Sequence, residues 1–114
     1  MVLRKKDGTA LLARLSLAVS RCDKRRGLLG CLGLEPDEGL LLKGCRIVHT
    51  FGMRFPIGLI FIDKKGRVVR IVQNLPPRRI CACLRARDVV ECCAGCPALE
   101  ALNPGDELIV GRDE

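Results

Sequence analysis

A six-residue run that is apolar throughout constrains this chain most: Ile57-Gly58-Leu59-Ile60-Phe61-Ile62. A strand with no polar position has to be covered on both faces, so it belongs in the middle of a fold. Asp63-Lys64-Lys65-Gly66 then reads as a turn, in which Gly66 can take a positive φ, and residues 67–73 supply the partner strand. The sequence therefore predicts a central antiparallel hairpin.

Shorter elements are predicted around this hairpin. Residues 9–20 alternate apolar and polar side chains, which indicates a strand, and further strands are expected at residues 39–42, 80–84, 88–92 and 107–110. Two short helices are expected, at residues 21–31 with Ser20 as N-cap and at residues 96–102 with Pro97 in the first turn. These elements predict an α+β domain whose antiparallel or mixed sheet curls into a partly closed barrel.

The length of 114 residues fits a single domain covering residues 1–114. No uninterrupted run of about 18 apolar residues occurs, so we expect no membrane span. Residues 11–19 resemble the apolar part of a signal peptide, but Arg14 interrupts them and no small-x-small cleavage site follows. We therefore expect a monomeric cytoplasmic protein, and expect most of its eight cysteines to be reduced thiols that pack as small hydrophobes.

The formal charge of +7 is unevenly spread along the chain. Residues 1–87 hold 19 Lys and Arg against 6 acids, whereas residues 88–114 hold one Arg and seven acids. A basic body suits an anionic partner, but three Phe and no Trp or Tyr leave few rings on which bases could stack. We therefore expect no nucleic-acid partner and interpret the charge as a solvated surface.

An ordered set of motifs runs along most of the chain. It comprises Arg26-Gly27-Leu28-Leu29-Gly30, Asp37-Glu38-Gly39-Leu40-Leu41-Leu42, His49-Thr50-Phe51-Gly52-Met53-Arg54-Phe55-Pro56-Ile57, Phe61-Ile62-Asp63, Val89-Val90-Glu91 and Pro104-Gly105-Asp106. Across residues 10–110 this order resembles the domain-of-unknown-function 192 family. The resemblance implies a small sheet-rich α+β domain with no assigned activity. Members with the His-Thr-Phe-Gly-Met stretch are often encoded beside genes for tight-adherence pilus assembly.

The chain departs from the family pattern at three positions. Gly58 stands where the resemblance implies Asp, so a site that used that carboxylate would be altered or lost here. Cys92 and Cys93 stand where relatives tend to carry Leu and Pro, which favours a packing role for both.

His49, the sole histidine, is the first candidate site residue. Together with Cys45 and Met53 it forms a set of soft ligands that copper(I) favours. Their spacing would align them on a helix, but Gly52 and Pro56 oppose a long helix, so chelation would need a bent loop. A metal site, a metal-free binding pocket at His49 and a purely structural role all remain open.

Cysteines between residues 81 and 96 form the second candidate, as Cys81-x-Cys83 and Cys92-Cys93-x2-Cys96. Their spacing is unlike common zinc sites, and a thioredoxin-like function of Cys93 and Cys96 lacks the βαβ setting that it needs. Cys22 and Cys96 lie near predicted helix N-termini, which would lower their thiol pKa values.

The third candidate combines Arg26, Arg54, Asp63 and Glu91. Glu91 follows two apolar residues in a predicted strand, and a buried carboxylate needs a partner such as arginine. A structural ion pair, a ligand pocket and acid–base chemistry are the alternatives, and no second convergent group supports the last.

Together these observations predict a non-enzymatic accessory or binding domain without cofactor or metal, since the nucleotide-loop, serine-hydrolase and zinc-protease motifs are absent. It would bind a small ligand or a protein partner through a pocket near His49, Thr50, Met53, Arg54, Glu91 and Arg26. The alternative is a soft-metal or thiol-redox protein that uses Cys45, His49 and Met53, or the cysteines at 81–96.

Overall fold

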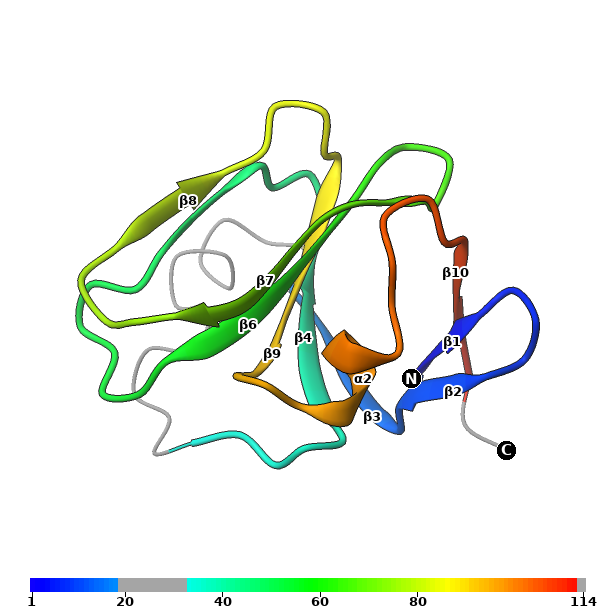
Figure 1. Cartoon of the computed structure of the whole chain (residues 1–114), viewed down its shortest axis with the longest axis horizontal. Helices are drawn as coiled ribbons and strands as arrows, with labels where there is room; N and C mark the ends of the chain where they lie inside the picture. Colours follow the sequence, from blue (N-terminus) through cyan, green and yellow to red (C-terminus); the bar gives the residue numbers. More distant parts are fainter. Residues whose placement is uncertain (19–32, 113–114) are drawn as a thin grey trace.

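Three open β-sheets make up most of the computed structural model, which describes residues 1–18 and 33–112 (Figure 1). The first sheet has the order β10-β1-β2, from β1 (Val2–Lys5), β2 (Ala10–Leu12) and β10 (Leu108–Gly111). The second has the order β3-β4-β9-β6-β7, from β3 (Arg14–Ala18), β4 (Glu38–Leu42), β9 (Asp88–Cys93), β6 (Ile57–Ile62) and β7 (Val68–Leu75). The third pairs β5 (Ile47–His49) with β8 (Ile80–Ala82), and α2 (Pro97–Glu100) follows β9.

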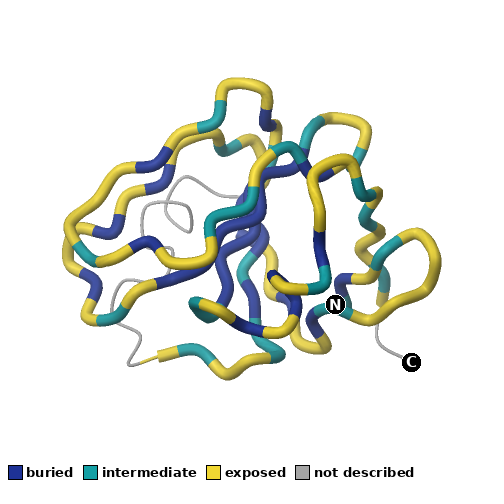
Figure 2. Tube along the Cα trace, viewed as in Figure 1, coloured by how far each residue is buried: buried dark blue, intermediate teal, exposed yellow. Residues whose placement is uncertain are grey.

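Strand β6 lies between β9 and β7, and all six of its residues are buried, which confirms the predicted central hairpin. Its side chains alternate between two cores on opposite faces of the five-stranded sheet. Ile60 and Ile62 enter the first core, whereas Ile57, Leu59 and Phe61 enter the second. Figure 2 shows that buried segments gather along the middle strands.

Each face of the five-stranded sheet is covered by a different partner. The first core packs against the β10-β1-β2 sheet and α2, which contribute Leu3, Leu12 and Leu99. The second core packs against the β5–β8 pair, which contributes Val48 and Cys81. The molecule is therefore layered, with β5–β8 and the first sheet on opposite sides of the central sheet (Figure 1).

The predicted barrel is wrong, because β3 and β7 end the central sheet without pairing with each other. The sheet stays open because its two apolar faces are each covered by a separate small sheet. The α+β class is also wrong: nearly all the regular secondary structure of the described residues is strand, and their only helix is the four-residue α2. The helix predicted at 21–31, with its cap Ser20, lies outside the described residues.

The mixed character of the sheet is confirmed, since β3 and β4 are parallel and the other neighbours antiparallel. The strand predicted at 9–20 is two strands, β2 and β3, that belong to different sheets. Strands β1 and β5 were not predicted. Within the described residues, no helix has the length and apolar character needed to cross a bilayer.

Gly58 has no room for a side chain. A Cβ built there would lie 2.4 Å from Leu99 Cδ1, 3.1 Å from the Cys93 carbonyl oxygen and 3.2 Å from Cys92 Sγ. Leu99 and Cys92 therefore occupy the space that a carboxylate would need, and this chain has no acidic site at that position.

Candidate functional site

The β5–β8 pair presents two unlike faces. Val48 and Cys81 are opposite each other in the register and are both buried in the second core. Neighbouring residues on a strand point the other way. Ile47, His49, Ile80 and Ala82 are accordingly exposed, with Ile47 60% and Ile80 65% accessible.

Phe51 extends this exposed surface beyond β5. Its ring lies 5.8 Å from the His49 imidazole, centroid to centroid, and the side chain is 49% accessible. His49 is in turn opposite Ile80 in the strand register. We call this surface the outer ribbon face, defined by Ile47, His49, Phe51, Ile80 and Ala82.

Thr50 fixes the loop that leads into β8. Its Oγ1 donates a hydrogen bond to the Pro76 carbonyl oxygen at 2.6 Å and accepts one from the Arg79 N–H at 2.9 Å. The backbone adds a bond from the Thr50 N–H to the Arg79 carbonyl, and one from the Arg78 N–H to the Thr50 carbonyl. Thr50 is fully buried, so it supports the outer ribbon face from beneath.

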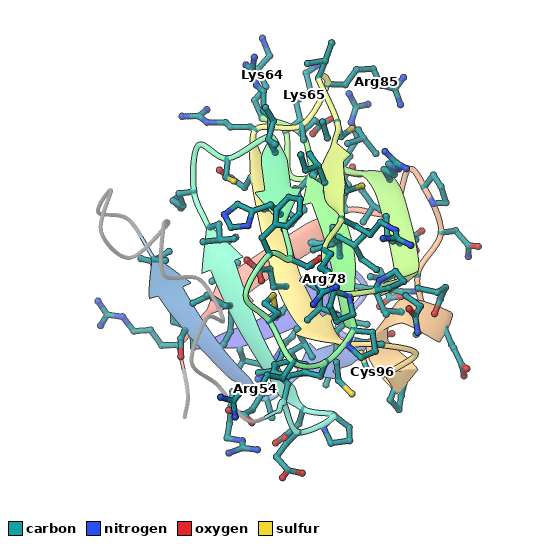
Figure 3. All side chains as sticks on the ribbon, turned by 90° about the vertical axis from the view of Figure 1, so that its left-hand side faces the viewer. Arg54, Lys64, Lys65, Arg78, Arg85 and Cys96 are labelled. Atoms are coloured by element: carbon teal, nitrogen blue, oxygen red, sulfur yellow. The ribbon has the colours of Figure 1, made fainter. Side chains whose placement is uncertain are left out.

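Met53 and Arg54, in the turn that follows, differ in burial. Met53 is buried in the second core, and its N–H donates to the Thr50 carbonyl oxygen at 3.2 Å. Arg54 is exposed. Figure 3 shows Arg54 at the opposite end of this side of the molecule from Lys64, Lys65 and Arg85, with Arg78 between them.

Glu91 is a buried carboxyl on the second-core side of β9. It is paired in register with Leu40 on β4 and Leu59 on β6, both of which belong to that core. Within residues 1–18 and 33–112 no side chain forms an ion pair with it, and desolvation raises its pKa to about 7.

The predicted site residues are thus divided between surface and interior. His49 and Arg54 are exposed, while Thr50, Met53 and Glu91 are buried. Arg26 lies outside the described residues. Asp63, a member of the third candidate set, lies in the β6–β7 turn and accepts hydrogen bonds from the backbone N–H groups of Lys65 and Arg67.

The soft ligands Cys45, His49 and Met53 do not share a face. Cys45 is half-buried and donates from Sγ to the Ile47 carbonyl oxygen, His49 is exposed, and Met53 is buried. In the part of the chain that the structure describes, no group of three or more His, Cys, Asp or Glu side chains is arranged to hold a metal ion.

Two thiols of the cysteine cluster form a pair. Cys92 and Cys96 are both buried and joined by a side-chain hydrogen bond. That bond, with backbone N–H groups of α2, lowers the pKa of Cys96 to about 6, while the same bond raises the pKa of Cys92. The six cysteines that the structure describes are free thiols.

Sequence reasoning missed how the basic residues gather. Residues 43–87 hold eleven Lys and Arg, all exposed, against the single acid Asp63. Within the described chain, only Arg67 of the eleven takes part in an ion pair, with Asp63 at 3.3 Å. The sequence feature that could have indicated this gathering is the absence of acidic residues from 43–62 and 64–87.

Comparisons with known proteins agree with this architecture. The model of the DUF192 family, described as "Uncharacterized ACR", matches residues 2–110. A search of curated proteins gives no match.

Two crystal structures are similar over nearly the whole chain. A protein described as a "putative transcription regulator" from Sinorhizobium meliloti 1021 has a TM-score of 0.80 and 25% identity, covering 95% of this chain and 89% of that one. A protein of unknown function from Novosphingobium aromaticivorans DSM 12444 has a TM-score of 0.81 and 21% identity, covering 96% of this chain and 82% of that one. The second likeness concerns the fold alone.

Proposed function

Because the chain belongs to the domain-of-unknown-function 192 family, whose description names no activity, we propose its function from its surface: a non-enzymatic binding domain that docks a protein partner on the outer ribbon face. One observation carries the proposal. Ile47 and Ile80 on one short pair of strands, and Phe51 in the turn after β5, are each about half exposed or more. Exposed apolar groups gathered in one place are typical of a protein-binding surface.

The charges around this face indicate what the partner carries. Residues 43–62 and 76–87, which contain β5, β8 and their loops, hold seven Lys and Arg and no acid. Six of the seven are arginines, which bind carboxylates through paired hydrogen bonds and are enriched at binding hot spots. The partner we propose therefore presents apolar side chains flanked by Asp or Glu.

The predicted residues take two roles in this proposal. His49 and Arg54, which are exposed, would contact the partner. Thr50, Met53 and Glu91, which are buried, would hold the surface in place. The chain would act as one cytoplasmic domain, in keeping with the free thiols of the six cysteines that the structure describes. The gene neighbourhood that the family resemblance implies links the proposal to pilus assembly or secretion, so we propose a protein of one of these systems as the partner.

The test is selection of short random peptides on the purified protein, with binding of the enriched peptides measured by fluorescence anisotropy. We expect enrichment of Asp or Glu next to Leu, Ile or Phe. Ile80→Ser should weaken binding of those peptides about tenfold or more. Ile109→Ser is the matched control, because Ile109 is 50% exposed on β10, in another sheet, and should leave binding unchanged.

Selection of no peptide, or of peptides that bind the Ile80→Ser variant as tightly as the parent, would overturn the proposal. Selection of basic peptides would overturn the charge argument in particular. Circular dichroism on both variants ensures that any loss reflects the surface rather than unfolding.

The Cys92–Cys96 pair favours a second candidate, a thiol-redox function. With oxidised glutathione, the Cys96 thiolate would attack one sulfur and release one glutathione thiolate. The Cys92 thiol would then lose its proton, attack Cys96 Sγ and release the second glutathione, leaving a Cys92–Cys96 disulfide. Mass spectrometry should find that disulfide in the parent and a trapped mixed disulfide on Cys96 in Cys92→Ala; unmodified thiols in both would exclude this function.

A further inference from the structure

A cleft of about 490 Å³ lies between two turns at one end of the molecule. One wall is the β6–β7 turn, which contributes Asp63, Lys64, Lys65 and Arg67. The other wall is the segment between β8 and β9, and Arg46 also lines the cleft. Figure 3 shows Lys64, Lys65 and Arg85 together at this end.

The lining of this cleft is strongly cationic. It comprises six Lys and Arg side chains and a single carboxylate: Arg46, Lys64, Lys65, Arg67, Arg85, Arg87 and Asp63. Asp63 is already occupied within its own turn, where it accepts bonds from the N–H groups of Lys65 and Arg67 and from Arg67 Nε. The other five cationic side chains form no ion pair among the described residues.

Hydrogen bonds fix the walls of the cleft relative to each other. Arg46 Nε donates to the Ala86 carbonyl oxygen at 2.9 Å, and the Arg87 N–H donates to the Ile62 carbonyl oxygen at 2.7 Å. The two walls are therefore fixed in the absence of an anion, and the cationic side chains that they carry line one cleft and repel one another. An anion that enters the cleft relieves that repulsion without a rearrangement of the backbone.

We propose that this cleft binds a small anion that carries two or more phosphate groups. A single phosphate would leave most of the five excess positive charges uncompensated. Arginine guanidinium groups match phosphate oxygens in geometry. The volume lies in the range of small-molecule sites, about 300–1,000 Å³. No aromatic side chain lines the cleft, so it recognises the phosphates and not a stacked base.

Two neighbouring clefts extend the site along the same end. One of about 570 Å³ shares Arg46 and Arg87, and one of about 440 Å³ shares Asp63, Arg67 and Arg85. A chain of several phosphates can span from one to the next, whereas orthophosphate fills only part of one.

The test is isothermal titration calorimetry with sodium tripolyphosphate, and with orthophosphate as comparison, at physiological ionic strength. We expect one tripolyphosphate per protein and at least about tenfold tighter binding than for orthophosphate. Arg85→Gln should weaken tripolyphosphate binding about tenfold. Arg4→Gln is the matched control, since Arg4 is an exposed arginine of β1 that lines none of these three clefts, and the variant should bind tripolyphosphate as the parent does.

Three results would overturn the proposal: no tripolyphosphate binding, equal weakening in both variants, or binding of duplex DNA without binding of tripolyphosphate. Equal weakening would mean attraction to net charge rather than to a cleft. Arg46, Arg85 and Arg87 belong both to this cleft and to the basic segments around the outer ribbon face. The two proposals are still tested separately, because Ile80→Ser should keep its affinity for tripolyphosphate while it loses the selected peptides.

Discussion

Glu91 shows how one side chain makes stability depend on pH. Its folded pKa is raised to about 7 by burial, against 4.5 for the exposed group. The folded state therefore holds the Glu91 proton more tightly, so the contribution of this carboxyl to stability is full below pH 4.5, falls as pH rises and levels off above about pH 7. The total loss of folding stability from this group is about 3 kcal/mol.

Glu91→Gln should remove this loss, because the amide stays neutral. We expect the variant to match the parent near pH 4 and to exceed it by up to about 3 kcal/mol near pH 8 in urea unfolding. Glu100→Gln, a change at an exposed glutamate of α2, is the control and should alter neither value. A difference in stability between Glu91→Gln and the parent that does not grow between these two pH values would contradict the account.

The close packing around Gly58 leads to a second prediction about a single residue. Gly58→Ala should destabilise the protein by about 1–3 kcal/mol, because the new methyl group meets Leu99 and a backbone carbonyl in a filled core. Gly111→Ala on β10 has open space and should stay within about 0.5 kcal/mol of the parent. If chemical denaturation gives the same loss of stability for both variants, the core around Gly58 can rearrange to admit a methyl group, and the prediction is wrong.

Among the elements, the β5–β8 ribbon depends on Thr50. Thr50→Val keeps the shape but leaves the Arg79 N–H and the Pro76 carbonyl oxygen without their side-chain partner. We expect a loss of about 1–3 kcal/mol and faster hydrogen exchange at the Arg79 amide. Thr9→Val, at an exposed position, should cost less than about 1 kcal/mol, and an Arg79 amide that exchanges at the parent rate would contradict the prediction.

The elements also show what sequence patterns can predict. Strand β6 was predicted with its observed bounds, because apolar side chains at every position require cover on both faces. Strand β5 was missed because only Val48 of its three residues is buried, and its pairing with β8 is set by distant residues. The prediction of a barrel was wrong for a related reason: the alternation of apolar and polar residues identifies which face of a strand is apolar, but not which strands become neighbours.

The candidate site was predictable to a similar extent. The motif order pointed to the segment from His49 to Arg54, and the structure divides it into an exposed face and its buried support. The burial of Glu91 was anticipated from the apolar pair before it. The exposure of Ile47 and Ile80 was not, because an apolar residue in a short strand is expected to point inward.

At the scale of the whole molecule, the charges of residues 43–87 are unbalanced. Ion pairs such as Lys5–Asp106 and Arg14–Asp37 lie in the first sheet or at the β3–β4 edge, while the eleven basic residues of 43–87 share one acid. Self-repulsion should therefore be screened by salt, and we expect the melting temperature to rise by about 2–3 °C when NaCl increases from about 20 to about 300 mM.

A charge reversal separates this effect from general salt effects. Arg85→Glu should raise the melting temperature at low salt, and the gain should vanish at high salt. Arg14→Glu should lower it at low salt, because Arg14 is bonded to Asp37 at 2.7 Å. If the melting temperature of the parent stays constant or falls as salt increases, the basic residues of 43–87 do not destabilise the protein by mutual repulsion, and the prediction is wrong.

The order β10-β1-β2 places the first strand of the chain between the second and the last. During synthesis, Leu3 can therefore pair with Leu12 early but has to wait for Val110 on its other side. The first core, which Leu3 and Leu12 help to form, stays incompletely covered on a nascent chain until Leu108–Gly111 has left the ribosome. Native folding of this domain therefore follows synthesis of the chain through Gly111.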